Sequence, residues 1–188
     1  HSSSRMGPAV SCLAVLVHLA FHGAGAAQAQ PVEEAARTNL ALAAQLCIQP
    51  GVQPEQKVTM FQQAGFEYRV DPPQGNSDTT YYFTAPAGTV EAQLYFGEMP
   101  SDCFATSPYV GVTAASAILD QLMPTFYPTY QRIVTQGAVD PATGQLALCV
   151  RYEQPGTQIP HVIGVAPNGD AQSCMENGTS RIFDFYSV

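Results

Sequence analysis

Only one histidine, His161, lies after residue 29, because the other three are His1, His18 and His22. A single imidazole excludes a metal site built from several histidines of one chain, and a Ser-His-Asp triad would have to use His161. The sequence has no G-x-S-x-G segment to supply a serine nucleophile. His161 is therefore only a weak catalytic candidate. We predict no catalytic residue, no metal site and no cofactor.

Three aromatic residues, Phe126, Tyr127 and Tyr130, lie in a connection that also contains Pro124 and Pro128. Exposed rings on a rigid loop make good binding anchors, because they bring a large contact area at a small entropic cost. The alternative is that these rings cover the end of a sheet and contribute only to packing. We predict that Phe126, Tyr127 and Tyr130 form a binding site.

Four cysteines, Cys47, Cys103, Cys149 and Cys174, follow Cys12, which lies in an apolar N-terminal run. An even number of cysteines in an exported domain indicates two disulfides, with three possible pairings. We favour Cys47–Cys103 and Cys149–Cys174, since the second pair lies in neighbouring strand-like segments. A zinc site is the alternative, but structural zinc usually takes its ligands from close C-x₂₋₄-C pairs, which these cysteines lack.

The first 29 residues resemble a tag remnant followed by a signal peptide. Residues 1–5 resemble the end of an affinity tag, and residues 9–21 form an apolar run of signal-peptide length. Ala27-Gln28-Ala29 fits the A-x-A cleavage rule, so the predicted mature chain begins at Gln30. A membrane anchor needs roughly 20 mostly apolar residues, which the polar residues around the run disfavour. Residues 30–188 then form one exported domain, periplasmic or extracellular.

This predicted domain is acidic. Six basic and all 15 acidic residues lie in it, so its formal net charge is −9. A negative surface repels phosphate backbones and anionic lipid headgroups, which makes nucleic acid and bare membrane poor partners. We expect the partner to be another protein or an envelope component. The oligomeric state stays open.

Helical and alternating patterns follow one another along the chain. Helices are predicted at 32–47, where Ala36, Leu40, Ala43 and Cys47 form one stripe, at 54–64 and at 114–123, the last capped by Thr113 and stopped by Pro124. Strands are predicted at 66–70, 79–84, 89–96, 103–112, 131–136, 145–153, 161–166, 171–175 and 181–186. Asn168-Gly169 predicts a tight hairpin turn before the segment 171–175.

Helices that are segregated from runs of strands predict an α+β domain with a mainly antiparallel sheet and two disulfides. Each half of the chain has a helix followed by three or four strands, with two cysteines. This layout resembles secreted protein inhibitors built from duplicated helix-plus-sheet units, at the level of fold only.

The leading hypothesis is a non-catalytic exported binding module, such as a protein inhibitor or an envelope accessory protein. One alternative is a secreted hydrolase that uses His161 with a serine or aspartate distant in sequence. Another is a structural envelope subunit, which would associate with itself. Turnover, stoichiometric capture and self-association distinguish the three.

Overall fold

The computed structural model describes residues 26–187, apart from residues 74, 76–77, 98–100 and 170–172. The predicted tag remnant and most of the predicted leader lie outside these residues. The helices are α1 (Ala26–Ile48), α2 (Pro54–Gln63), a short 3₁₀ turn (Pro86–Gly88) and α3 (Val112–Phe126). None of the described helices combines the length and the apolar character that crossing a membrane requires.

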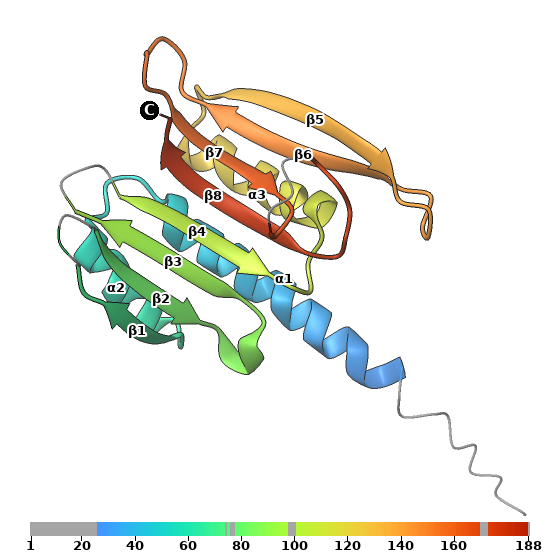
Figure 1. The fold of residues 1–188 in the computed structure, drawn as a ribbon, viewed down its shortest axis with the longest axis horizontal. Coiled ribbons are helices and arrows are strands. Elements are labelled where there is room, and N and C mark those ends of the chain that lie inside the picture. The colour runs from blue at the N-terminus through green and yellow to red at the C-terminus, as the bar shows by residue number, and fades with distance from the viewer. Residues whose placement is uncertain (1–25, 74, 76–77, 98–100, 170–172, 188) are drawn as a thin grey trace, which may run out of the picture.

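Among the described residues, eight strands form one sheet in which every neighbouring pair is antiparallel. They are β1 (Glu67–Asp71), β2 (Thr79–Thr84), β3 (Glu91–Phe96), β4 (Asp102–Ser107), β5 (Gln131–Val139), β6 (Leu146–Glu153), β7 (His161–Ala166) and β8 (Ser180–Tyr186). Their order across the sheet is β1-β2-β3-β4-β8-β7-β6-β5. The predicted α+β class is therefore confirmed (Figure 1).

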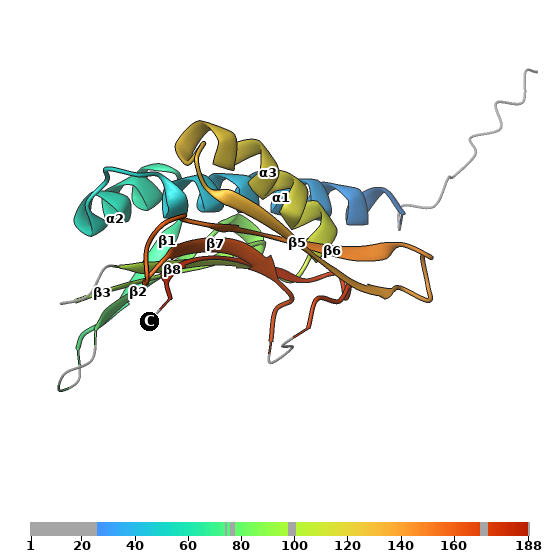
Figure 2. The same cartoon turned by 90° about the horizontal axis from the view of Figure 1, so that it is seen from above.

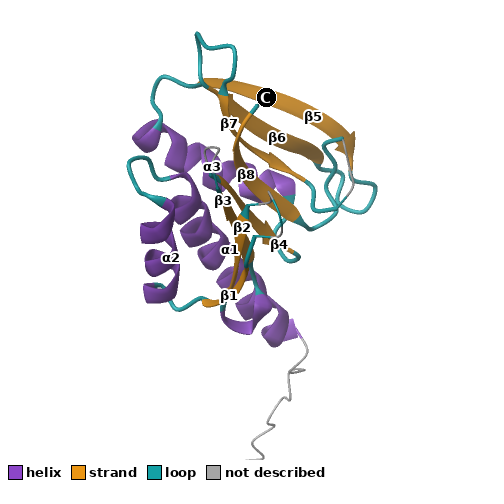
Figure 3. Ribbon diagram, turned by 60° about the vertical axis from the view of Figure 1, so that its left-hand side comes forward, coloured by secondary structure: helices purple, strands orange, loops and turns teal. Residues whose placement is uncertain are grey.

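All three helices cover the same face of the sheet (Figures 2 and 3). The predicted stripe of α1 is confirmed, since Ala36, Leu40, Ala43 and Cys47 are fully buried. In α2, the Phe61 ring stacks on Phe83 of β2 with the centroids 4.2 Å apart. Burying a large side chain such as Leu40 or Phe61 against the sheet contributes roughly 1.5–3 kcal/mol. This core fixes the helices over one side of the sheet.

The sheet consists of two meanders that join where β4 pairs with β8. We call α1, α2 and β1–β4 the first half, and α3 with β5–β8 the second half. Each half contains one disulfide, Cys47–Cys103 in the first and Cys149–Cys174 in the second. The predicted pairing is confirmed. The arrangement also matches the predicted layout of a helix and several strands in each half.

The prediction for α3 was wrong at both ends. Thr113 does not cap the helix, because its hydroxyl accepts the Leu148 N–H at 3.3 Å. The N-cap is Gly111, and the Glu176 carboxylate accepts the Thr113 N–H at 3.2 Å. Pro124 lies inside the helix, which continues to Phe126. A proline this close to the end removes only one hydrogen bond of the last turn.

Two strand predictions also need correction. The predicted strand 103–112 is shorter, because Ser107 begins a turn: its hydroxyl donates to the Thr89 carbonyl and accepts the Tyr109 N–H. Residues 173–175 of the predicted strand 171–175 are not in a strand, and 171–172 lie outside the described residues. Cys174 therefore lies in the connection from β7 to β8, and Asn168-Gly169 does not start a two-residue hairpin. The disulfide pairing was correct although this reason for it was wrong.

Candidate functional site

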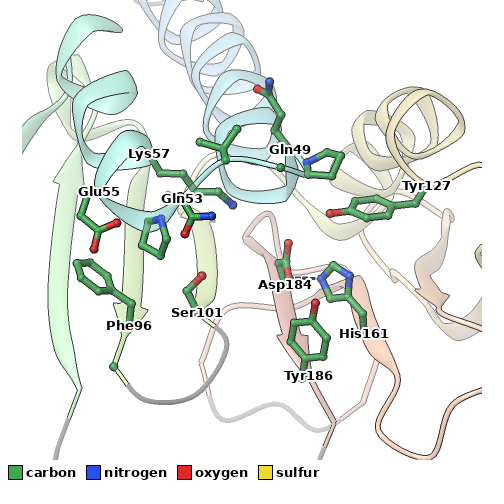
Figure 4. Close-up of a pocket in the computed structure, with 15 residues that line it drawn as sticks. Gln49, Gln53, Glu55, Lys57, Phe96, Ser101, Tyr127, His161, Asp184 and Tyr186 are labelled. Atoms are coloured by element: carbon green, nitrogen blue, oxygen red, sulfur yellow. Dashed lines mark hydrogen bonds and ion pairs between the residues drawn. The ribbon is translucent and has the colours of Figure 1, made fainter.

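A pocket of about 460 Å³ opens where the two halves meet at one end of the sheet. Its walls come from the connection between α1 and α2, the start of α2, the end of β3 and the facing ends of β7 and β8 (Figure 4). The side chains that matter most for its chemistry are Gln53, Glu55, Lys57, Tyr127, His161, Asp184 and Tyr186. A volume in this range is typical of sites for small molecules.

The last carbonyls of α1 are held by two side chains of this site. A helix leaves its last four carbonyls without partners inside the helix, so other groups must bond to them. The Tyr127 hydroxyl donates to the Ile48 carbonyl at 2.7 Å, and the Lys57 amine donates to the Cys47 carbonyl. The end of α1, the start of α2 and the end of α3 are thereby fixed around the pocket.

His161 lies at the floor of the site and is almost fully buried. Its Nε2 lies 2.5 Å from Asp184 Oδ1, and Asp184 is buried on the neighbouring strand β8. Its ring also stacks on Tyr186 with the centroids 4.7 Å apart. Since an ionised carboxylate can only accept hydrogen bonds, the Nε2–H donates to Asp184.

The other ring nitrogen, Nδ1, lies 2.8 Å from the Tyr130 hydroxyl. Burial, followed by the nearby Tyr186 and Asp184, raises the pKa of Tyr130 to about 12. The hydroxyl therefore stays protonated at neutral pH and donates to Nδ1. Both nitrogens of His161 therefore have hydrogen-bond partners within the protein.

The structure brings together Tyr127, Tyr130 and His161, three of the residues that the sequence singles out. The Tyr127 and Tyr130 rings lie 4.6 Å apart, and their centroids are 5.3 and 5.6 Å from the His161 ring. Tyr127 lines the pocket, while Tyr130 reaches the site through its bond to His161. Phe126 is only partly buried, packs against the hydrophobic core and does not line the pocket.

Sequence reasoning missed Lys57 and Asp184. Lys57 precedes Phe61 by four residues, so the helical period places it on the buried face of α2. Asp184 follows Ile182 by two residues on a strand, so alternation places it on the face toward the helices. Both positions carried a periodic signal, but the polar residue type argued for an exposed side chain.

Lys57 is the only buried lysine or arginine among the described residues. Its exposed fraction is 7%, and the loss of solvation on burial lowers its pKa. The negative charge of Asp184 acts in the opposite direction but is the smaller influence. In Figure 4 the amine points into the pocket between Gln53 and Asp184.

Within the described ranges, no group of three or more His, Cys, Asp or Glu side chains is arranged to hold a metal ion. The site instead offers a buried amine, a buried carboxylate, amides and aromatic rings. Such a set can bind a small polar molecule through hydrogen bonds and ring contacts.

Comparisons of the chain with protein-family models, with curated proteins and with solved structures gave no match.

Proposed function

We propose that this protein is a non-catalytic exported binding module, and that the pocket between the two halves is its ligand site. The observation that carries the proposal is that both ring nitrogens of His161 are bonded inside the protein, beside an open pocket. A histidine that removes a proton directly from a bound ligand needs a ring nitrogen within hydrogen-bond reach of that proton. The pocket can therefore hold a ligand while the ring nitrogens of His161 stay bonded to Tyr130 and Asp184.

The size of the pocket supports a small ligand. At about 460 Å³ it falls in the size range of small-molecule sites. Its lining is mainly polar, which favours a polar ligand. Tyr127, Tyr186 and Phe96 supply rings, and Gln53, Lys57 and Asp184 supply polar groups. We therefore propose a small polar ligand at this site. Capture of another protein, as an inhibitor or envelope accessory protein would do, stays a prediction.

The test is a binding screen with two matched tryptophan variants. Gln53→Trp places a large ring where the Gln53 side chain points into the pocket, and Gln136→Trp makes the same change on the exposed edge strand β5. Polar metabolites that raise the melting temperature of the oxidised protein are the expected hits. Their binding should fall at least tenfold in Gln53→Trp and stay unchanged in Gln136→Trp. Equal binding to both variants would place the ligand elsewhere.

A secreted hydrolase remains the second candidate, favoured by the chain of contacts from Tyr130 through His161 to Asp184. This chain has the connectivity of a nucleophile, a base and an orienting carboxylate. The raised pKa of Tyr130 opposes it, because a hydroxyl that holds its proton is a poor nucleophile. Saturable turnover that Tyr130→Phe and His161→Ala both abolish would establish the hydrolase and overturn the binding module. Stable self-association without ligand would instead favour a structural subunit.

Export is also part of the proposal. Two disulfides are compatible with an oxidising compartment. If cleavage follows Ala29, Pro31 becomes the second residue of the mature chain and falls in the first turn of α1, where proline is well tolerated. The mass of the protein secreted from cells, compared with the mass of a chain that begins at Gln30, tests this prediction.

A further inference from the structure

Lys57 is the only lysine in the 188 residues, and the fold buries it. Lysine is among the residues that are least often buried without a charged partner. Among the described residues, the ion pairs are Arg69–Asp71, Arg132–Asp120, Arg151–Glu153 and His161–Asp184, and none includes Lys57. The single lysine is thus a buried amine without an ion-pair partner in the described part of the chain.

A capping role accounts for only part of this arrangement. The bond from Lys57 to the Cys47 carbonyl satisfies one acceptor at the end of α1. The neighbouring Ile48 carbonyl is satisfied by a neutral group, the Tyr127 hydroxyl. Capping therefore needs a donor but not a charge. An ammonium also has three donors, and the bond to Cys47 uses one.

The surroundings of Lys57 favour the neutral amine. Burial withdraws the ammonium from water and lowers the pKa of Lys57, and the carboxylate of Asp184 only partly offsets this. A lysine whose pKa is lowered by desolvation holds more of its neutral, nucleophilic form at a given pH than an exposed lysine does. The amine lines the pocket and points into it, so a small ligand in the pocket would meet it directly (Figure 4).

We propose that Lys57 forms an imine with a small aldehyde or ketone that enters the pocket. This inference rests on the proposed function, because it requires the pocket to be the ligand site, and it names the chemical class of the ligand. The imine attaches the ligand reversibly and needs no turnover.

The step balances without an oxidant or a reductant. The lone pair of the neutral Nζ attacks the carbonyl carbon, a C–N bond forms, and the electron pair of the C=O π bond moves to oxygen. A proton passes from nitrogen to oxygen and gives a carbinolamine. Loss of the hydroxyl group with the second nitrogen proton releases one water and leaves the C=N bond. Addition of water reverses the sequence and frees the ligand.

The experiment exploits the single lysine. The folded, disulfide-bonded Gln136→Lys variant carries one added lysine on an exposed strand position, which serves as an internal reference. The variant is incubated at pH 7 with propanal and a limiting amount of sodium cyanoborohydride, which reduces an imine to a stable secondary amine. Peptide mapping by mass spectrometry then gives the adduct at each lysine. An ordinary lysine, with a pKa of about 10.4, is almost entirely protonated at this pH.

We expect at least a tenfold excess of adduct at Lys57 over the added lysine, and an excess that disappears when the protein is unfolded in urea. The wild-type protein should give the same adduct, and Lys57→Arg should give none beyond the N-terminal amine. An equal or smaller amount at Lys57 in the folded variant would overturn the inference, since burial would then shield the amine rather than activate it.

The two proposals fail in different ways. If a ligand without a carbonyl group binds in the pocket while Lys57 stays unmodified by propanal, the imine is wrong and the binding site stands. If Gln53→Trp leaves the binding of every ligand unchanged and also leaves the Lys57 adduct unchanged, the pocket is not the ligand site. Phosphate or acetate binding that depends on Lys57, without adduct, would show that the amine serves only as a cation.

Discussion

The two halves of this protein fasten their helices to the sheet by different means. In the first half, α1 is joined to β4 by the Cys47–Cys103 disulfide and by a stripe of fully buried apolar side chains. In the second half, α3 also buries an apolar stripe of Val112, Ala115, Leu119 and Met123, but within the described residues no disulfide joins it to the sheet. Polar bonds hold it in addition: the Ser116 hydroxyl donates to the Leu148 carbonyl at 2.9 Å and accepts the Val150 N–H at 3.2 Å. Apolar contacts tolerate small displacements, whereas buried hydrogen bonds require their partners in place.

This difference bears on the pocket, which lies where the halves meet. The first half contributes Lys57, and the second contributes Tyr127, His161 and Asp184. Neither disulfide joins the two halves. The pocket is therefore aligned by the pairing of β4 with β8 and by the bond from Tyr127 to Ile48. Changes within one half should alter stability more than they alter the site.

The largest effect is expected from the disulfide of the first half. Replacing Cys47 and Cys103 with alanine should lower the free energy of unfolding by about 2–5 kcal/mol. The same change at Cys149 and Cys174 should lower it by about 0.7 kcal/mol less. The reason is that the Cys47–Cys103 bond closes a loop of 56 residues and the Cys149–Cys174 bond one of 25. Urea unfolding of both variants at pH 7 measures the difference. If the Cys149–Cys174 variant loses more free energy of unfolding than the Cys47–Cys103 variant, loop length does not decide which disulfide stabilises the protein more.

The polar bonds of the second half give the next largest effect. Ser116→Ala removes one hydroxyl that bonds to two backbone groups of β6, the Leu148 carbonyl and the Val150 N–H. Both groups precede Arg151, where the pairing of β6 with β7 ends. The loss should be about 1–3 kcal/mol, since buried polar groups are left without a partner. The control is Ser187→Ala, at an exposed position, where the change should stay within about 0.5 kcal/mol. If Ser116→Ala and Ser187→Ala have equal effects, the two backbone groups of β6 find other hydrogen-bond partners in the variant.

At the junction of the halves, Tyr130→Phe should have a smaller effect that depends on pH. The pKa of Tyr130 is about 12 in the folded protein and about 10 in the unfolded chain. Its contribution to the free energy of unfolding is therefore complete below about pH 10. It is lost as the pH rises from about 10 to 12, when the unfolded chain releases the proton more readily. Wild type should exceed the variant by about 1 kcal/mol at pH 8, and the two should converge toward pH 12. A constant difference would contradict the raised pKa of Tyr130 in the folded protein.

Local patterns in the sequence predicted most elements of the fold. The bounds of β2 and β7 agree with the predicted strands, because alternating or continuous apolar residues between turn residues define them without help from elsewhere. The stripe on α1 was equally local. The N-terminus of α3 was not predictable in this way, since its cap comes from Glu176, which follows Thr113 by 63 residues. When the capping residue lies far away in the sequence, the residues next to the helix give no signal of where the helix begins.

The site was predictable only in part, for the same reason. His161 and Tyr130 were singled out by residue type and by their connection, but their partner Asp184 depends on the pairing of β7 with β8. Lys57 could have been found from the helical period of α2, had a charged residue been accepted on a buried face. Polar residues at apolar positions of a period are therefore the signal most worth following in this sequence.

The smallest effect is expected where the two halves carry comparable surface ion pairs. Arg132 binds Asp120 through two bonds of 2.9 and 2.8 Å, and Tyr152 donates to Asp120 at 2.5 Å, whereas the Arg69–Asp71 pair of the first half is a single exposed contact. Although burial opposes it, bonding to Arg132 and Tyr152 lowers the pKa of Asp120. Its contribution is therefore present above about pH 4, the unfolded value, and is lost as the pH falls through the lower folded value.

Asp120→Asn should reduce the free energy of unfolding by about 0.5 kcal/mol at pH 7, a figure that allows for solvent screening of the partly exposed pair. The difference from wild type should shrink as the pH falls below about 4 toward the lowered pKa of Asp120. Asp71→Asn should have almost no effect at pH 7, because both partners are more than half exposed. Urea unfolding at pH 7 and at pH 3 gives both comparisons. If the two substitutions have equal effects, the polar network on α3 adds no more than an ordinary surface pair, and the contrast between the halves rests on Ser116 alone.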